Sequence, residues 1–237
     1  CFPTHALRRT RMEFQEDSSL ATRLLQDLGE ELFEAKPLPH LTELVYCLTR
    51  SFLNRFGPLP PTDSEVLLFM SGVGLERVLL KSHRQPHQGE CEGIYYDVDF
   101  LDYDLRVAEF KSTRMSSKRP PEEFSEGWRR QVLGYLYCLR EKDGAMEATL
   151  AVLFLMGNYA PPFPELRCWR AKASWDEIRK NWRWLQERKE VYLRHHAEAR
   201  LPEPYKFCMD WECKNCRYSL LCEAWKAAQE LGNATVS

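Results

Sequence analysis

The segment 97-DVDFLDYDLRVAEFK-111 carries the pattern that decides both the fold class and the chemistry expected of this chain. Apolar positions on either side of a polar turn centred on Tyr103 predict a β-hairpin. Residues two apart in a strand share a face, so Glu109 and Lys111 project together from the second arm. In this register Asp97 lies opposite Glu109 on the same face. The sequence therefore predicts that two carboxylates and an ammonium group meet on one hairpin.

Asp99 is the alternative partner of Glu109, because the register of a hairpin is not fixed by its sequence alone. Two carboxylates suit a hard divalent cation such as Mg²⁺ or Mn²⁺. A neighbouring lysine orients an attacking water or stabilises the charge that develops on phosphate. Taken alone, an E-x-K pattern on a strand is more typical of a solvated sheet edge than of a catalytic site.

Two helical segments add to this pattern. Glu76 follows two glycines in an expected helix over 65–81, and Gln131 and Tyr135 share one face of an expected helix over 124–140 by their i, i+4 spacing. The order of helix carboxylate, D, E-x-K and Q-x-x-x-Y resembles the RecB-like branch of the PD-(D/E)xK nucleases. The family often has histidine where Glu76 stands, so the preferred metal is left open.

This resemblance implies an α/β fold with a central mixed sheet flanked by helices. It also implies that Mg²⁺ or Mn²⁺ is held by three carboxylates: Glu76, Asp97 and Glu109. Lys111 would act at the hydrolytic water, while Gln131 and Tyr135 would arrange the site and the DNA. The implied reaction is metal-dependent hydrolysis of phosphodiester bonds in DNA.

The C-terminal part contains Cys208-x4-Cys213-x2-Cys216-x5-Cys222, whose polar surroundings favour metal ligation over core packing. Zinc on these four cysteines is one interpretation. The CRISPR-associated Cas-four group and the nuclease domain of AddB, which the chain resembles most, combine one early cysteine with a late C-x2-C-x5-C triplet. That resemblance implies a 4Fe-4S cluster on Cys47, Cys213, Cys216 and Cys222. Cys91, Cys138 and Cys168 are interpreted as core or incidental thiols.

Length and composition bound the organisation of the chain. We expect a tail over 1–18 and one nuclease domain over 19–237, in which 201–225 and Cys47 form the iron-sulfur part. The net charge of -2 does not by itself indicate a nucleic-acid binder. Nine cysteines without a secretory signal indicate a reducing compartment, the cytoplasm, and no apolar run is long enough for a membrane span.

Six basic residues near the E-x-K strand are candidates for phosphate contacts, or else form a solvated surface: Lys111, Arg114, Lys118, Arg119, Arg129 and Arg130. Trp175, Trp182 and Trp184 fit core packing better than base stacking. Further helices are expected over 19–34, 41–56 and 171–200, and a buried strand over 148–156.

The resemblance favours an exonuclease that trims single-stranded DNA or single-stranded ends, as in CRISPR spacer acquisition beside the integrase complex. Two alternatives remain open at this point. One is a repair and recombination nuclease of the AddB type. The other is a non-catalytic DNA-binding subunit with a structural zinc or iron-sulfur site.

Overall fold

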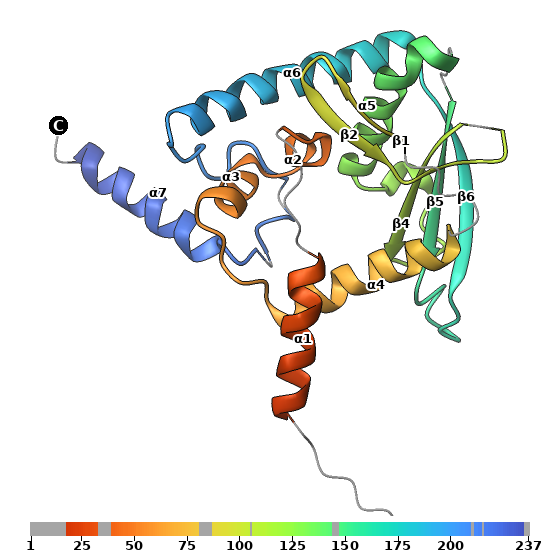
Figure 1. The fold of residues 1–237 in the computed structure, drawn as a ribbon, viewed down its shortest axis with the longest axis horizontal. Coiled ribbons are helices and arrows are strands. Elements are labelled where there is room, and N and C mark those ends of the chain that lie inside the picture. Colours follow the sequence, from red (N-terminus) through yellow and green to blue (C-terminus); the bar gives the residue numbers. More distant parts are fainter. Residues whose placement is uncertain are drawn as a thin grey trace, which may run out of the picture.

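A four-stranded mixed sheet, ordered β3-β4-β5-β6, lies at one side of the molecule with helices packed against it (Figure 1). Its strands are β3 (Phe100–Leu101), β4 (Val107–Thr113), β5 (Glu147–Phe154) and β6 (Glu165–Lys172). β4 and β5 are parallel, whereas β3 and β6 each run antiparallel to their neighbour. The computed structural model describes residues 18–32, 39–80, 87–104, 106–143, 147–209, 211–214 and 216–234. The predicted α/β class, with a mixed sheet flanked by helices, is confirmed.

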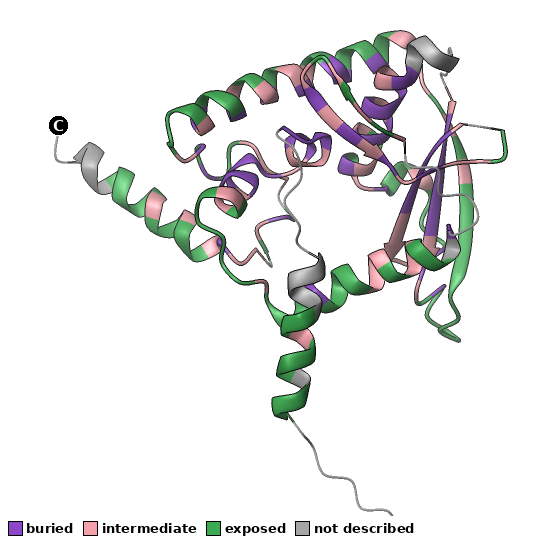
Figure 2. Cartoon of the chain, in the orientation of Figure 1, coloured by how far each residue is buried: buried purple, intermediate pink, exposed green. Residues whose placement is uncertain are grey.

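The described ranges contain seven α-helices. They are α1 (Ser18–Leu32), α2 (Leu41–Val45), α3 (Leu48–Phe56), α4 (Asp63–Leu79), α5 (Glu126–Asp143), α6 (Trp175–Ala197) and α7 (Ser219–Ala234), with a 3-10 turn η1 (Pro121–Glu123) before α5. Buried residues concentrate in α2, α5, β4 and β5, whereas α1, α7 and β6 are largely exposed (Figure 2). No helix in the described ranges combines the length and apolar character that a bilayer span requires.

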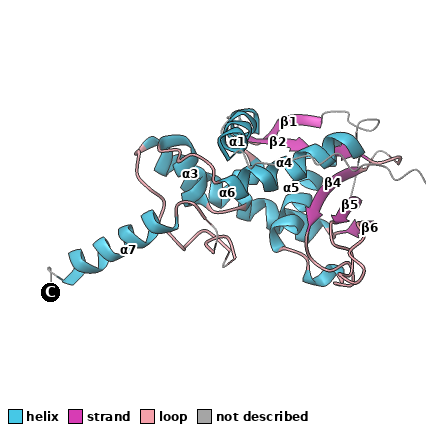
Figure 3. Cartoon of the chain, turned by 90° about the horizontal axis from the view of Figure 1, so that it is seen from below, coloured by secondary structure: helices cyan, strands magenta, loops and turns pink. Residues whose placement is uncertain are grey.

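A separate two-stranded hairpin is formed by β1 (His87–Cys91) and β2 (Ile94–Val98). Glu92 and Gly93 make its turn, both with positive φ (47° and 77°), which matches the right-handed twist of the two strands. In the view turned by 90°, this hairpin and β6 lie at opposite margins of the molecule (Figure 3). Strand β1 was not predicted from the sequence, and β2 was expected to pair with the E-x-K strand instead. That pairing is wrong.

The two faces of β4 are covered by different helices. Ala108 and Phe110 pack with Leu75 and Leu80, so α4 covers this face. The residues of β4 that alternate with Ala108 and Phe110 belong to the other face. On that face Val107 packs in the core that α5 and α6 form. Glu109 and Lys111 alternate with Phe110 and therefore lie on the α5 side. The site described below is thus placed between the sheet and α5.

The predicted helix over 41–56 is in fact two helices separated by Tyr46 and Cys47. Partners from distant segments replace the helical hydrogen bonds here. The N–H of Cys47 donates to Glu212 Oε1 (2.9 Å), and the N–H of Leu48 donates to the carbonyl of Phe207 (3.3 Å). Arg188 Nε donates to the carbonyl of Leu44, which would otherwise accept from Leu48. Tertiary contacts have therefore overridden a continuous helical pattern.

Helix α6 begins at Trp175 rather than at residue 171, because 171 and 172 belong to β6. Ser174 caps the helix, and Glu177 completes a capping box by accepting from the N–H of Ser174 (2.8 Å). Strand β6 and helix α7 were not predicted as separate elements. The expected tail over 1–18 lies outside the described residues except for Ser18, which already begins α1.

Candidate active site and cysteine pocket

Glu109 and Lys111 lie side by side on β4, between the sheet and α5. The side chain of Glu109 is fully buried and that of Lys111 is 21% exposed, and Lys111 Nζ forms an ion pair with Glu109 Oε1. Both residues are fixed by the parallel β4–β5 ladder, in which Glu109 pairs with Leu150 and Lys111 with Val152. The strand therefore presents one carboxylate and one cation toward the same space, as the i, i+2 spacing predicts.

The carboxylate partner of Glu109 is Asp99, and the predicted position of Asp97 opposite Glu109 is wrong. Phe100 pairs with Ala108, so continuing the β3–β4 register by one residue sets Asp99 opposite Glu109. The N–H of Phe110 donates to Asp99 Oδ2 at 2.7 Å, which holds this carboxylate beside the strand. Asp97 instead pairs with Gln88 in the β1–β2 hairpin. The register error is two residues.

Helix α5 supplies the remaining predicted residues. Lys111 Nζ donates to Gln131 Oε1 (3.3 Å), and Gln131 Nε2 donates to the hydroxyl of Tyr135 (2.8 Å). That hydroxyl donates in turn to the backbone carbonyl of Asp97 (2.8 Å). Gln131 and Tyr135 are both buried. A continuous chain of contacts thus runs from Glu109 through Lys111 and α5 to the backbone of β2.

Burial dominates the electrostatics of the two carboxyl groups. Burial, followed by repulsion from the Asp99 carboxylate, raises the pKa of Glu109 to about 8, although neighbouring Lys111 acts in the opposite direction. Burial likewise raises the pKa of Asp99, again against the influence of Lys111. For Lys111, burial lowers the pKa, but the Glu109 carboxylate outweighs it and raises the pKa above its ordinary value. Lys111 therefore stays protonated, and the carboxyl pair gains from any cation placed between them.

Glu109 also has the feature that a ligand to a cation would show. Neither of its carboxylate oxygens has a well-oriented hydrogen-bond donor among the described residues, although both are buried. Buried polar atoms left in this way cost about 1–3 kcal/mol or more each, so such atoms call for a partner. Even so, no group of three or more His, Cys, Asp or Glu side chains in the described ranges has metal-binding geometry.

Glu76, the third predicted metal ligand, lies half-buried on α4. Gly72, one turn earlier on this helix, approaches β4 so closely that a Cβ there would lie 3.6 Å from Ser112 Oγ. Ser112 belongs to the face of β4 opposite to that of Glu109 and Lys111. The helix that carries Glu76 thus covers the other side of the sheet, and a role for Glu76 in metal binding stays a prediction.

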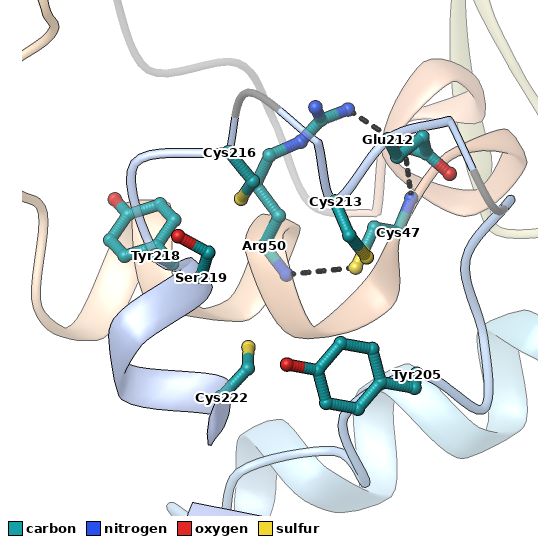
Figure 4. A pocket seen from close by; sticks show the side chains of 9 residues that line it. All are labelled: Cys47, Arg50, Tyr205, Glu212, Cys213, Cys216, Tyr218, Ser219 and Cys222. Atoms are coloured by element: carbon teal, nitrogen blue, oxygen red, sulfur yellow. Dashed lines mark hydrogen bonds and ion pairs between the residues drawn. The ribbon is translucent and has the colours of Figure 1, made fainter. Parts of the chain in front are cut away.

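Four cysteines border one pocket, although they lie far apart in the sequence. Cys47 is the N-cap of α3, Cys213 and Cys216 lie in the loop before α7, and Cys222 lies within α7. Figure 4 shows these side chains around the pocket with Arg50, Glu212 and Tyr205. These are the four cysteines that the resemblance assigns to a 4Fe-4S cluster. No disulfide joins them in the part of the chain that the structure describes.

Two thiols of this pocket, those of Cys47 and Cys222, have a pKa above the ordinary value of a thiol. Burial, followed by the charges of Cys47, Cys216 and Cys213, raises the pKa of Cys222 to about 11. Burial also raises the pKa of Cys47. Thiolates crowded in this way become favourable when a cationic centre neutralises them. Four thiols are the donor set that an iron-sulfur cluster or zinc takes, although the described cysteines do not have the geometry of a site for a single metal ion.

Glu212 and Arg188 hold the pocket together, and neither was singled out from the sequence. The carboxylate of Glu212 is 1% exposed and pairs with Arg50 (3.0 Å), while its Oε2 accepts from the N–H of Met209 (2.8 Å). Arg188 donates to the carbonyls of Tyr46 and Phe207 across the same junction. Its burial lowers the pKa of Arg188 to about 10. These side chains attach the C-terminal loop to the α2–α3 break.

Cys208 lies next to the pocket rather than among its lining residues. Its Sγ is 3.7 Å from Cys213 Sγ, and burial followed by the hydrogen bond with Cys213 raises the pKa of Cys208 to about 12. Both Cys47 and Cys208 therefore lie within reach of the late triplet. Of the other cysteines, Cys91 and Cys138 pack against the main core and Cys168 is exposed.

The six basic residues near the E-x-K strand differ in their contacts and exposure. Arg130 pairs with Glu126 (3.1 Å) and stacks on Trp184, and Arg129 donates to backbone carbonyls of η1. Arg114 and Lys118, in contrast, are exposed on the loop that follows β4. Of the three tryptophans, Trp182 is buried and stacks on Tyr137 (4.3 Å between ring centroids). Core packing is thus the role of Trp182.

Comparison with known proteins extends the description of the fold. No family model matches this chain, and no curated protein matches it in sequence. Ten chains of solved structures match, among them the crystal structure of SSO0001. That match has a TM-score of 0.54 at 19% identity and covers 86% of this chain and 95% of that chain. At this identity the likeness shows a shared fold over most of both chains.

Proposed function

We propose that this chain is a metal-dependent DNA nuclease with a RecB-like PD-(D/E)xK core and a 4Fe-4S cluster bound by Cys47, Cys213, Cys216 and Cys222. The observation that carries the proposal is the buried carboxyl pair of Asp99 and Glu109 beside Lys111. Burial raises the pKa of both acids, and Lys111 forms an ion pair with Glu109 Oε1, although neither Glu109 oxygen has a well-oriented hydrogen-bond donor among the described residues. Such a pair fits a hard cation with oxygen ligands.

The residues of the site would have different roles in phosphodiester hydrolysis. Bound Mg²⁺ or Mn²⁺ would polarise the phosphate and supply an activated water. Asp99 and Glu109 would hold that ion, and Asp97 and Glu76 remain further candidates for ligands. Lys111, kept protonated by Glu109, stabilises negative charge that develops on the phosphate. Gln131 accepts from Lys111 and so fixes the direction of its ammonium group, while Tyr135 holds Gln131.

The substrate we propose is DNA with a single-stranded end, trimmed exonucleolytically. The exposed cations Arg114 and Lys118 follow directly after the catalytic strand and suit a phosphate backbone. Within this class we favour trimming during CRISPR spacer acquisition, with the integrase complex as partner, in the cytoplasm, where thiols stay reduced. Neighbouring integrase genes would support this pathway, whereas neighbouring helicase genes would favour repair of the AddB type.

The test is cleavage of end-labelled single-stranded oligonucleotides with Mg²⁺ or Mn²⁺, compared with chelator. Lys111→Ala and the isosteric Glu109→Gln should each lower the rate by at least about a hundredfold, with circular dichroism unchanged. Tyr137→Phe, which removes the hydrogen bond from a tyrosine of α5 to Glu92, is the matched control. Wild-type protein that binds DNA without cleaving it under any of these conditions would instead identify a non-catalytic DNA-binding subunit.

A further inference from the structure

Tyr46 lies between the carboxylate site and the cysteine pocket. It ends α2, directly before Cys47, and its N–H donates to the carbonyl of Thr42 (3.2 Å). Its own carbonyl accepts from Arg188. The backbone of Tyr46 is therefore held by the same contacts that hold the junction beside the cysteines.

The ring of Tyr46 points toward α5, on the stripe that carries the site residues. A Cβ on Gly127 would lie 2.7 Å from Cε1 and 3.2 Å from the hydroxyl of Tyr46, so the phenol occupies the space that glycine leaves. Gly127 is one turn before Gln131 on the same face of α5. Gln131 in turn accepts from Lys111. The phenol thus lies one helical turn from the residue that orients Lys111.

The ring of Tyr46 also contacts the cysteine-bearing loop. Tyr46 and Trp211 make an edge-to-face contact with ring centroids 6.3 Å apart. Trp211 directly precedes Glu212, whose carboxylate accepts from the N–H of Cys47. The position of the phenol is therefore set jointly by Gly127 on α5 and by the loop that bears Cys213.

The charged residues of β4 affect the pKa of this phenol. Burial raises the pKa of Tyr46, while Lys111 lowers it and Glu109 raises it. Tyr46 also contributes to the electrostatics of Lys111. No hydrogen bond occupies the Tyr46 hydroxyl among the described residues. The group is thus a free donor beside the carboxylate–lysine site.

We infer that Tyr46 is a further substrate-contacting residue, whose hydroxyl donates a hydrogen bond to a phosphate oxygen of the DNA strand lying over Lys111 and Glu109. The inference rests on the proposed nuclease function. A phenol is a suitable donor, because hydrogen bonds to anionic oxygens are about twice as strong as neutral ones. Since Tyr46 is fixed by the segment that carries Cys47, this contact depends on an intact cysteine pocket.

The experiment compares Tyr46→Phe with wild type and with Tyr137→Phe, a tyrosine of α5 away from the site. Affinity for a fluorescent single-stranded oligonucleotide is measured by anisotropy in chelator, and kcat and KM are measured with Mg²⁺. We expect Tyr46→Phe to weaken binding by about tenfold, as for one charge-assisted hydrogen bond. Iron content and circular dichroism should stay at the wild-type level.

Gly127→Ala provides an independent second test, because it displaces the phenol of Tyr46 without changing its chemistry. It should weaken binding in the wild-type background but add little in the Tyr46→Phe background, as expected for a shared interaction. A contrary result would be that the wild type cleaves DNA while Tyr46→Phe keeps its oligonucleotide affinity and its kcat/KM within twofold of wild type. That result would overturn the role of Tyr46 alone. Absence of both cleavage and DNA binding in wild type would overturn the nuclease proposal itself.

Discussion

Asp99 lies opposite Glu109 across the β3–β4 pair, and the backbone N–H of Phe110 donates to its carboxylate at 2.7 Å. Burial, followed by the charge of Asp99, raises the pKa of Glu109, whereas the pKa of Asp99, which burial raises, is lowered by the hydrogen bond with Glu109. Like charges this close cannot both ionise in a buried site without compensation. The pair is therefore arranged to share a cation or a proton, which defines what the site can bind.

Asp99→Asn should be the more damaging of two isosteric substitutions, and Asp97→Asn the milder. Asp99 faces Glu109, whereas Asp97 is linked to the site through its backbone carbonyl, which a side-chain change leaves in place. We expect the nuclease rate to fall at least about a hundredfold for Asp99→Asn and less than tenfold for Asp97→Asn. The reverse order in single-turnover cleavage would restore the register that the sequence suggested.

Stability of the metal-free protein should fall as pH rises from about 5 to 8. The pKa of Glu109 is about 8 in the folded protein, against an ordinary value of 4.5. Between these values the folded state binds more protons than the unfolded state, so the free energy of unfolding decreases with pH. Urea unfolding in chelator at pH 5 and pH 8 measures this difference.

Glu109→Gln provides the control for this pH dependence, because an amide does not titrate. The variant should lose part of the difference between pH 5 and pH 8 that wild type shows. Adding Mn²⁺ should stabilise wild type more at pH 8 than at pH 5, because the ion competes with the proton for the carboxylates. An equal pH dependence in both proteins would mean that Glu109 ionises normally.

The chemistry on β4 could be predicted from the sequence, but its partner strand could not. The i, i+2 spacing of Glu109 and Lys111 and the i, i+4 spacing of Gln131 and Tyr135 depend only on local geometry, and both hold in the structure. The partner of Glu109 depends on which strands pair. The polar β1 gives little strand signal, yet it pairs with β2. The turn before β4 is centred on Asp104 rather than on Tyr103, and this shifts the register by two residues.

The same distinction applies to the cysteine pocket. The family resemblance predicted which four cysteines border it, with matching spacing only in the late triplet, and the structure brings these four together. The break at Tyr46 and Cys47 has no local signal, because Glu212, Phe207 and Arg188 create it from more than 100 residues away. The role inferred for Tyr46 follows from that break, so it became visible only in the folded structure.

Replacing Arg114 and Lys118 together by alanine should weaken DNA binding and reduce its salt dependence. Both residues are exposed on the loop after β4. Two lost contacts with single-stranded DNA correspond to a slope of log K against log salt that is smaller by about 1.4. Lys180→Ala with Arg183→Ala, which removes two exposed cations from α6, is the matched control. An unchanged slope in the first variant would remove this loop from the DNA-binding surface.

Cys47→Ser and Cys208→Ser together separate an iron-sulfur cluster from local zinc. Cys47 borders the pocket with Cys213, Cys216 and Cys222, whereas Cys208 contacts Cys213 from beside it. A 4Fe-4S cluster needs four thiolates, so protein purified without air should lose iron and its brown colour in Cys47→Ser and keep both in Cys208→Ser. Iron analysis and visible absorption measure this.

The stability of the two variants should follow their metal content. A cluster that joins Cys47 to the late triplet closes a loop of more than about 100 residues, which in the disulfide model stabilises by up to about 4–5 kcal/mol. Cys47→Ser should lose an appreciable part of this in denaturant unfolding, because the α2–α3 break is then attached to the C-terminal loop by non-covalent contacts alone, among them those of Glu212 and Arg188. If Cys208→Ser releases the metal and Cys47→Ser retains it, the centre is a local four-cysteine site, and the pocket in Figure 4 is not its ligand set.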